Sequence, residues 1–379
     1  MGAALWSTPA FADPPAGAPP AAPPDAPATP PPPMPAAPPP PPPAAPPPTN
    51  TDAMAATRPD VLPPIDVGAW VRAGSLIQKS DWHMDNAYVE LHAGGKIHKN
   101  VGVTVNLASN YTNFSTANVQ VEDAIISFDP VDEFHVWAGH LLVPVDRANA
   151  SGPFFMIPWN YPGFLTNGLT TVVTAPLEGP LGRNNGAVVW GDIMKGKLTY
   201  LAGVFDNGSV ATSPLYSGRL RLCLWDPEGG FWGNGSFFGD KDILSIGVGA
   251  QYQKHGVSAT QNWTDINVDA LIEKKLGGGA FVTGEAAYYH FSNVMDNGYV
   301  LAAYASPTLG GIGNLQPSVR YQWAKPKGGG STVWDIGPQL SFLVKGPALR
   351  VNATYTHTDL GSGAPKGDAF QLGAQAIFF

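Results

Sequence analysis

The feature that most constrains the fold of this chain is a period-two alternation of apolar and polar residues, which recurs from about residue 67 onward. From Leu244 to Tyr252, apolar side chains at even positions alternate with Ser, Gly and Gln at odd positions. The stretch from Phe370 to Phe378 repeats the pattern. Successive residues of a strand point to opposite faces of a sheet, so each segment predicts a β-strand with one apolar and one polar face.

Sixteen such segments follow one another along the chain. Each covers about 10–14 residues, with boundaries expected to within about three residues. They are expected at 67–78, 85–95, 99–109, 118–129, 132–143, 185–194, 197–206, 215–226, 241–254, 264–275, 279–292, 297–306, 314–325, 332–345, 348–358 and 368–379. Lipid offers no hydrogen-bond partner to an open sheet edge, so an even number of long alternating strands favours a closed barrel. The predicted fold class is all-β, a transmembrane antiparallel β-barrel of about sixteen strands.

The composition of the polar faces argues against a soluble β-sandwich. Charged residues make up 13% of the chain, against about 25% in ordinary globular domains. The polar strand positions are mainly Thr, Asn, Gln and Gly, which suits an aqueous lumen. Aromatic residues near the expected strand ends resemble the girdles of membrane barrels. The residues in this set are Trp70, Trp82, Trp190, Tyr216, Trp225, Trp323 and Trp334.

The prolines divide the chain near residue 65, because 25 of the 40 lie in residues 1–64. Ala10-Phe11-Ala12 has the small-x-small form of a signal-peptidase site, so residues 1–12 are interpreted as the remnant of a signal peptide. Residues 13–64 are expected to form a Pro/Ala-rich arm that is disordered or in polyproline II conformation. Residues 65–379 are expected to form the barrel.

The connections between the expected strands alternate between short turns and longer polar loops. The longest, 144–184, contains Pro153, Pro158, Pro162 and Pro176, which excludes a membrane-spanning helix and predicts a loop. In a barrel too wide to fill itself with side chains, such a loop is expected to fold inward and constrict the lumen. The segment from Asp226 to Asp240 falls among the short turns but is much longer than they are.

Several function classes are disfavoured. The formal net charge of -8 provides no basic surface for nucleic acid. The single cysteine, Cys223, excludes a disulfide framework and a cysteine zinc site. The sequence holds no G-x-S-x-G, H-E-x-x-H, P-loop or G-x-G-x-x-G motif, and the histidines lack ligand spacing. No enzyme activity, catalytic residue, cofactor or metal is therefore expected.

Two neighbouring stretches resemble a known family. Val121 to Phe128 reads VEDAIISF, and Val136 to Arg147 reads VWAGHLLVPVDR. A hairpin that ends in such a Gly-x-x-x-x-Pro strand and leads into a long loop resembles the Gram-negative sixteen-stranded porins, nearest to the phosphate-selective porin O/P type. The resemblance implies that loop 144–184 folds into the pore. Phe379 is similar to the C-terminal aromatic residue that the barrel-assembly machinery of such bacteria reads.

The chain also departs from that family. The apolar set of the last strand includes Phe378, which would turn Phe379 toward the lumen. The dense ladder of Lys and Arg that phosphate selectivity requires is missing, so phosphate specificity is not expected. Residues 67–379 hold 24 acidic and 20 basic residues, which makes the barrel weakly cation-leaning at most.

Charged residues at polar strand positions are the candidates for pore lining, because a charge on the lipid face costs about 2–4 kcal/mol at mid-bilayer. The expected pore-lining residues are Arg72, Glu90, Glu122, Asp146, Arg147, Glu178, Arg183, Arg219, Arg221, Arg320 and Arg350, with Asp269, Glu273, Glu285 and Asp335 as further wall acids. Two interpretations stay open. The arginines and facing loop acids produce a transverse field, or the arginines only hold the long loop.

The aromatic residues of the long loop also allow two interpretations, a stacking surface for sugars or anchors against the wall. They are Phe154, Phe155, Trp159, Tyr161 and Phe164. The expected function is a passive outer-membrane channel for ions and small hydrophilic solutes. It is expected to be a homotrimer in outer-membrane lipid, with the N-terminal arm in the periplasm. The alternative is a structural barrel whose Pro-rich arm contacts peptidoglycan and tethers the membrane to the cell wall.

Overall fold

The computed structural model describes residues 64–78, 81–84, 88–112, 116–160, 163–166, 169–172, 182–206, 213–258, 260–361 and 366–378. The expected signal remnant, the Pro-rich arm up to residue 63, Glu178 and Phe379 lie outside the described residues. None of the described helices is long and apolar enough to span a membrane.

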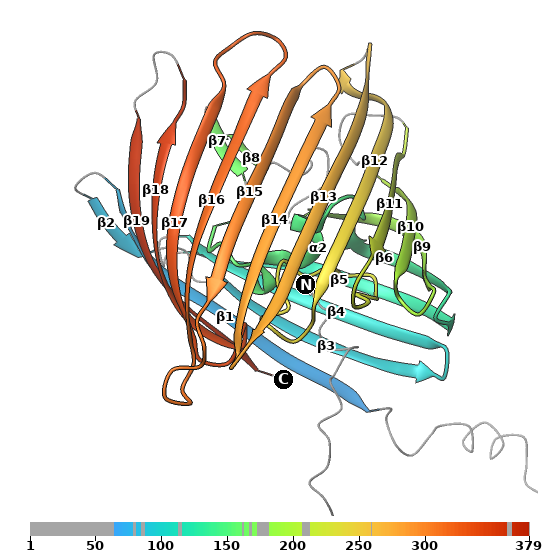
Figure 1. Cartoon of the computed structure of the whole chain (residues 1–379). Helices are drawn as coiled ribbons and strands as arrows, with labels where there is room; N and C mark the ends of the chain where they lie inside the picture. The colour runs from blue at the N-terminus through green and yellow to red at the C-terminus, as the bar shows by residue number, and fades with distance from the viewer. Residues whose placement is uncertain are drawn as a thin grey trace, which may run out of the picture. The chain divides into compact units, whose positions relative to one another are not determined.

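The strands form one antiparallel sheet that closes on itself (Figure 1). The short strand β2 and strand β3 both pair with β1, over different parts of its length, so they share one position in the ring. The ring therefore has sixteen strand positions, as predicted, and the hairpin β7–β8 forms a separate two-stranded sheet. The elements are β1 (Ile65–Gln78), β2 (Asp81–Met84), β3 (Tyr88–His98), β4 (Val101–Thr112), β5 (Thr116–Val131), β6 (Phe134–Leu142), α2 (Arg147–Phe155), β7 (Gly163–Thr166), β8 (Leu169–Val172), β9 (Arg183–Ile193), β10 (Leu198–Phe205), β11 (Leu215–Cys223), β12 (Ile243–Ser258), β13 (Gln261–Gly277), β14 (Ala280–Phe291), β15 (Met295–Ala305), β16 (Asn314–Pro326), β17 (Val333–Leu343), β18 (Leu349–Asp359) and β19 (Gly367–Phe378).

Closure is made by the first and last strands. β1 pairs with β19 without interruption, from Ala69 opposite Phe378 to Gln78 opposite Ala369. Every other junction in the ring joins strands that are consecutive in the chain, apart from the inserted hairpin β7–β8 between β6 and β9. The sheet therefore has no free edge between its first and last strand, which is the condition for a sheet that crosses lipid.

The two faces of the sheet separate apolar from polar side chains, as the alternation predicts. In the β11–β12 pair, Leu220 is 58% exposed and Val248 opposite it is 49% exposed, both on the outer face. Arg219 and Arg221, the sequence neighbours of Leu220, are buried toward the interior. At the C-terminus Phe378 is 62% exposed on the outer face, in agreement with the predicted register of the last strand.

A β-bulge in β5 breaks the alternation at one point. Asn106 of β4 pairs with Asp123, and the next residue, Leu107, pairs with Val121, so Glu122 has no partner in the ladder. As a result Glu122 and Asp123 are both buried on the inner side, although they are consecutive. A strict period-two assignment places Asp123 on the outer face, and the bulge corrects that placement.

Two of the tryptophans assigned to the girdles point inward instead. Trp70 is fully buried and packs edge-on against Phe154 of α2, with ring centroids 5.3 Å apart. Trp190 is buried against Trp137 and Phe231. The reason is the same alternation, because Trp70 lies two residues from the inward Arg72 and so shares its face. Trp82 and Tyr216, by contrast, are exposed.

A charge on the outer face provides a test of this orientation. Val248→Arg is expected to lower the free energy of unfolding by about 2–4 kcal/mol if residue 248 lies near the bilayer midplane, because the guanidinium would face lipid. The measurement is reversible denaturant unfolding in lipid vesicles, with Val248→Leu as the matched control. Equal unfolding free energies for the Arg and Leu variants would contradict the assignment of this face to lipid.

Candidate functional site: the lumen of the barrel

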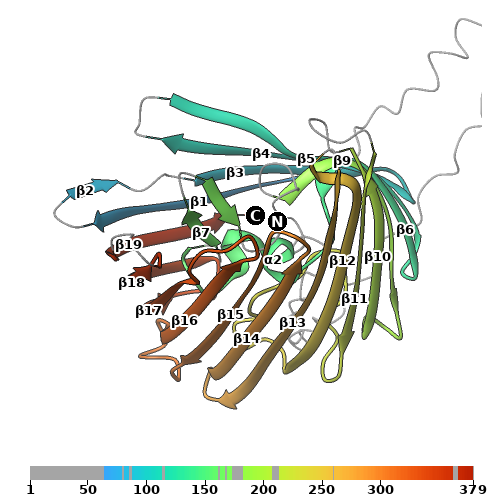
Figure 2. The same cartoon turned by 90° about the horizontal axis from the view of Figure 1, so that it is seen from above.

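The long connection after β6 enters the barrel, as predicted, and it contains a short helix that was not predicted. Viewed from above, α2 lies inside the ring of strands (Figure 2). All nine residues of α2 are buried. Gly152 has φ 59° and interrupts the helix immediately before Pro153. Such a left-handed backbone favours glycine, so the turn after the first part of α2 depends on this residue.

The N-terminus of α2 is capped by Asp146. Its carboxylate accepts a hydrogen bond from the backbone N–H of Asn149 at 3.3 Å and one from the hydroxyl of Tyr289 on β14 at 2.6 Å. Asp at an N-cap satisfies a backbone donor that has no partner inside the helix. The cap therefore also attaches the start of α2 to the opposite wall.

Two inward glycines make room for this loop. A Cβ at Gly249 on β12 would lie 1.9 Å from the carbonyl oxygen of Val145. A Cβ at Gly373 on β19 would lie 2.4 Å from the indole ring of Trp159. Both distances are far below van der Waals contact, so the loop approaches the wall where the wall has no side chain.

Three predicted wall arginines hold the far end of the loop. Arg72 on β1 donates to the carbonyls of Pro153 (3.1 Å) and Trp159 (2.5 Å), and its guanidinium lies 3.9 Å from the Trp159 ring centroid. Arg320 on β16 donates to the carbonyl of Asn160 at 2.6 Å. These arginines sit on strands that are separate in sequence and close in the ring, as the closed sheet predicts.

Arg350 on β18 is fully buried among neutral acceptors. Its guanidinium donates to the carbonyls of Met156 (2.7 Å) and Ile157 (3.2 Å). It also donates to the side-chain oxygen of Gln375, at 3.2 Å from Nε and 3.1 Å from Nη2. No carboxylate among the described residues forms an ion pair with Arg350, whereas Arg320 has Asp335 at 3.5 Å.

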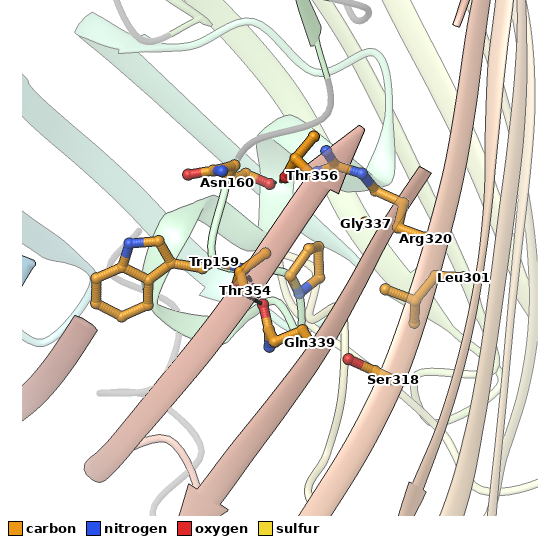
Figure 3. A pocket seen from close by; sticks show the side chains of 10 residues that line it. Trp159, Asn160, Leu301, Ser318, Arg320, Gly337, Gln339, Thr354 and Thr356 are labelled. Atoms are coloured by element: carbon orange, nitrogen blue, oxygen red, sulfur yellow. Dashed lines mark hydrogen bonds between the residues drawn. The ribbon is translucent and has the colours of Figure 1, made fainter. Parts of the chain in front are cut away.

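A pocket lies between the end of the loop and the wall (Figure 3). The labelled side chains come from the loop residues Trp159 and Asn160 and from strands β15 to β18. Six of its ten lining residues have polar side chains, Arg320 among them, and Leu301 lies at one side. The lining residues are Pro158, Trp159, Asn160, Leu301, Ser318, Arg320, Gly337, Gln339, Thr354 and Thr356.

The start of α2 takes part in a buried network of opposite charges. Arg147 donates to both carboxylate oxygens of Glu228, at 2.7 and 3.0 Å, and lies 3.3 Å from Asp269. Arg219 donates to both oxygens of Asp269, at 2.5 and 2.8 Å. Burial by itself would raise the pKa of Glu228, but Arg147 and Arg221 hold it well below its usual range. The carboxylate of Glu228 is therefore ionised when the protein is folded.

A third group lies where β3, β5 and β9 face the lumen. Arg183, the first residue of β9, lies 3.4 Å from Glu122 and 3.3 Å from Asp123. The hydroxyl of Tyr88 donates to Glu122 at 3.1 Å. Glu90 is buried beside them on β3, and neither of its oxygens accepts a hydrogen bond from the described residues.

The ten described members of the predicted pore-lining set are thus all buried on the inner side, and Glu178 lies outside the described residues. Their role in lining a pore stays a prediction. The sequence pattern missed Asp123, because the bulge hides it, and Glu228, because it lies in a connection and not in a strand. The unusual length of that connection was the signal for Glu228. Among the described residues no three His, Cys, Asp or Glu side chains are grouped to hold a metal ion.

The aromatic side chains of the loop act as anchors where they are described. Phe154 and Phe155 pack edge-on against Trp70, with centroids 5.3 and 5.5 Å apart. Trp159 lies under Arg72. Tyr161 lies outside the described residues, as does the side chain of Phe164.

Asp146 makes stability depend on pH. Burial raises the pKa of Asp146 to about 6 from 3.8. Between these values the unfolded chain loses the proton and the folded chain keeps it, so stability falls as pH rises through this window. The expected loss is about 2 kcal/mol in the free energy of unfolding between pH 4 and pH 7. Asp146→Asn cannot ionise, keeps an N-cap residue and removes this contribution.

The measurement is the free energy of unfolding of the wild type and Asp146→Asn at both pH values. The other titrating groups are common to both proteins, so the difference between the two pH dependences isolates Asp146. Parallel pH dependences would show that the pKa of Asp146 is the same in the folded and in the unfolded protein.

A comparison with protein-family models found no match, and a comparison with curated proteins found none either. Solved structures of bacterial outer-membrane proteins, by contrast, share the fold. OmpF of Salmonella typhi, in a complex with daunomycin, is 12% identical, with a TM-score of 0.58 over 83% of this chain and 97% of that one. OprB of Pseudomonas putida at low pH is 10% identical, with a TM-score of 0.55 over 83% and 92%.

OmpT of Vibrio cholerae, an outer-membrane protein in its trimer form, is 12% identical, with a TM-score of 0.50 over 83% of this chain and 99% of that one. These identities are too low to carry a function, but the agreement extends over nearly the whole length of each neighbour. None of the three structures named is described as phosphate-selective. The chain has the sixteen-stranded fold of the bacterial outer-membrane porins.

Proposed function

We propose that the protein is an outer-membrane channel through which ions and small hydrophilic solutes diffuse passively. The observation that carries the proposal is a closed barrel with an apolar outer face and charged inner side chains, entered by the loop that contains α2. A barrel of sixteen strands is wide enough to hold an aqueous path in addition to an inward loop. On this proposal the barrel works without catalytic chemistry.

The inward loop, within 144–184, is the proposed constriction. Arg72, Arg320 and Arg350 hold its far end, and Glu228 and Asp269 hold its start. Both interpretations of the arginines draw support from these contacts, because a guanidinium bonded to a neutral carbonyl holds the loop and still keeps its charge. Arg72, Arg320 and Arg350 therefore place three guanidinium charges on one part of the wall, with Asp335 at 3.5 Å from Arg320.

Acidic side chains gather on other parts of the wall. β13 and β14 contribute Asp265, Asp269, Glu273 and Glu285, and β3 and β5 contribute Glu90, Glu122 and Asp123. Their counter-charges on the inner side are Arg147, Arg183, Arg219 and Arg221. Such a separation of charge across a narrow passage sets ion preference more than the net charge does.

The proposal extends to the surroundings of the barrel. The apolar outer face would contact outer-membrane lipid, and a homotrimer fits the trimer form of the similar OmpT structure. The N-terminus of β1 and the C-terminus of β19 lie at the end of the barrel with mostly short connections, which in a porin is the periplasmic end. The Pro-rich arm would then extend into the periplasm, within reach of peptidoglycan. Phe379 would be read by the barrel-assembly machinery.

Planar bilayers test the channel directly. Purified full-length protein is expected to produce stepwise increases of conductance in KCl. Neutral polymers of increasing size should define the largest solute that enters the channel. A preparation that is folded, as shown by the mobility shift of unheated protein in SDS gels, but conducts no current would contradict the proposal.

The charge of Arg350 provides a test of ion preference. Arg350→Gln removes a positive charge that no carboxylate balances among the described residues, so the channel should become more cation-selective, by about twofold in the permeability ratio. The measurement is the reversal potential across a KCl gradient. The matched control is Lys345→Gln, which removes an exposed positive charge at a turn. Equal reversal potentials for both variants would place Arg350 away from the ion path.

A further inference from the structure

The connection between β11 and β12, residues 224–242, enters the lumen from the end opposite the α2 loop. The α2 loop joins the fifth and sixth strand positions, whereas residues 224–242 join the eighth and ninth. In an up-and-down barrel the connections alternate between the two ends, so these two leave from opposite ends. The sequence already marked this connection as far longer than the other turns at its end. We refer to residues 224–242 as the turn segment.

The turn segment is fastened to the wall by polar and aromatic contacts. Arg221 on β11 donates to the carbonyls of Trp232 (3.1 Å) and Gly230 (2.7 Å). The ring of Phe231 stacks on Trp137 of β6, with centroids 4.6 Å apart.

The second half of the turn segment is held by one carboxylate. Glu273 on β13 accepts hydrogen bonds from the hydroxyl of Ser236 (2.7 Å) and from the backbone N–H groups of Phe237 (3.1 Å) and Gly239 (2.8 Å). Three hydrogen bonds to one buried carboxylate hold residues 236–239 in a defined conformation. The turn segment therefore has a defined place in the lumen.

Its inner side contacts α2 along the length of the helix. The backbone N–H of Gly233 donates to the carbonyl of Ala150 at 3.3 Å, and that of Gly235 donates to the carbonyl of Phe155 at 3.2 Å. Arg147 donates to the carbonyl of Asn234 at 2.8 Å as well as to both oxygens of Glu228. The turn segment thus supplies acceptors for the first residue of α2 and donors for its middle and end.

Glu228 is the centre of this contact. Besides Arg147, it accepts hydrogen bonds from the hydroxyl of Ser245 on β12 (3.1 Å) and from the backbone N–H of Asn234 (3.1 Å). It therefore connects the wall, the turn segment and α2 at one carboxylate. A helix of nine residues is not stable by itself in water, so its position depends on such contacts.

We propose that the turn segment is a second constriction element, and that Glu228 is the positioning residue through which it fixes α2 and limits the open size of the channel. The proposal rests on the channel function proposed above. Without the Glu228 carboxylate, Arg147 loses its bidentate partner in a buried site, and α2 is expected to move away from the turn segment toward water. The passage is then wider, and its width fluctuates more.

Single-channel recording tests this in the full-length protein. Glu228→Ala is expected to raise the conductance about twofold with larger current noise, and Glu228→Gln, which keeps an acceptor oxygen, to raise it less. The matched control is Asp242→Asn, which removes a carboxylate of the same segment that is paired with the exposed Lys274 and does not contact α2. Conductance in Glu228→Ala equal to that of the wild type and the control would overturn the proposal.

A covalent link tests the same contact without relying on conduction. A Cβ at Gly233 would lie 3.3 Å from the Cβ of Ala150, close to the spacing of about 3.5–4.5 Å found in disulfides. Ala150→Cys with Gly233→Cys, in a Cys223→Ala background, is expected to form a disulfide under mild oxidation. Combined with Glu228→Ala, the oxidised link should return the conductance to the wild-type value, and reduction should release it.

Hydrogen–deuterium exchange distinguishes a failure of the proposed channel function from a failure of the proposed role of the turn segment. The backbone amides of 147–155 are expected to exchange slowly in the wild type and faster in Glu228→Ala, whether or not the protein conducts. A folded wild type that never conducts but shows this difference would refute the channel and keep the role of Glu228 in positioning α2. A channel that conducts but shows no difference in exchange, with no disulfide between residues 150 and 233, would refute the role of the turn segment.

Discussion

The structure depends on the pairing of β1 with β19, because that pairing removes the last open edge of the sheet. In lipid a backbone N–H or C=O without a partner costs several kcal/mol, so a sheet either closes or does not span. Closure then dictates the rest. Every strand must present apolar side chains outward, and the polar side chains of the strands are collected mainly in one enclosed space. The many charges inside the barrel therefore follow from the need for an apolar outer face.

Charges that are enclosed in the barrel need partners. The α2 loop and the turn segment supply these partners. Arg72, Arg320 and Arg350 find backbone carbonyls of the α2 loop, while Arg147 reaches from the loop to Glu228 and Asp269. Breaking a buried ion pair by removing one partner is far more costly than the net stability the pair supplies, because one charge is left uncompensated. This asymmetry explains how a loop rich in Asn, Gly and Pro keeps a defined place in the lumen. The same contacts that position the loop are those that shape the passage.

Much of the barrel was predicted from the period-two alternation of the sequence alone. The sixteen strand positions and the outward Phe378 were predicted correctly, because alternation is a local property that each strand carries in its own residues. Predictions failed where the local rule was interrupted or incomplete. The bulge at Glu122 brought Asp123 inside, and Trp70 was assigned to a girdle although it shares the face of Arg72. The helix α2 was not predicted, because its short segment has a cap but little intrinsic helix propensity.

The sequence by itself determined which strand residues lie on the outer and which on the inner face of the sheet, except at the bulge of Glu122, since side-chain direction in a regular strand depends only on position in the alternation. It also identified the two connections that are too long to be simple turns. Only the tertiary structure decided that these connections enter from opposite ends and meet, with Glu228 binding Arg147 across 81 residues of sequence. No local pattern encodes such a contact. It arises because ring closure brings distant strands around one space, where buried charges can be balanced only by whatever else is enclosed there.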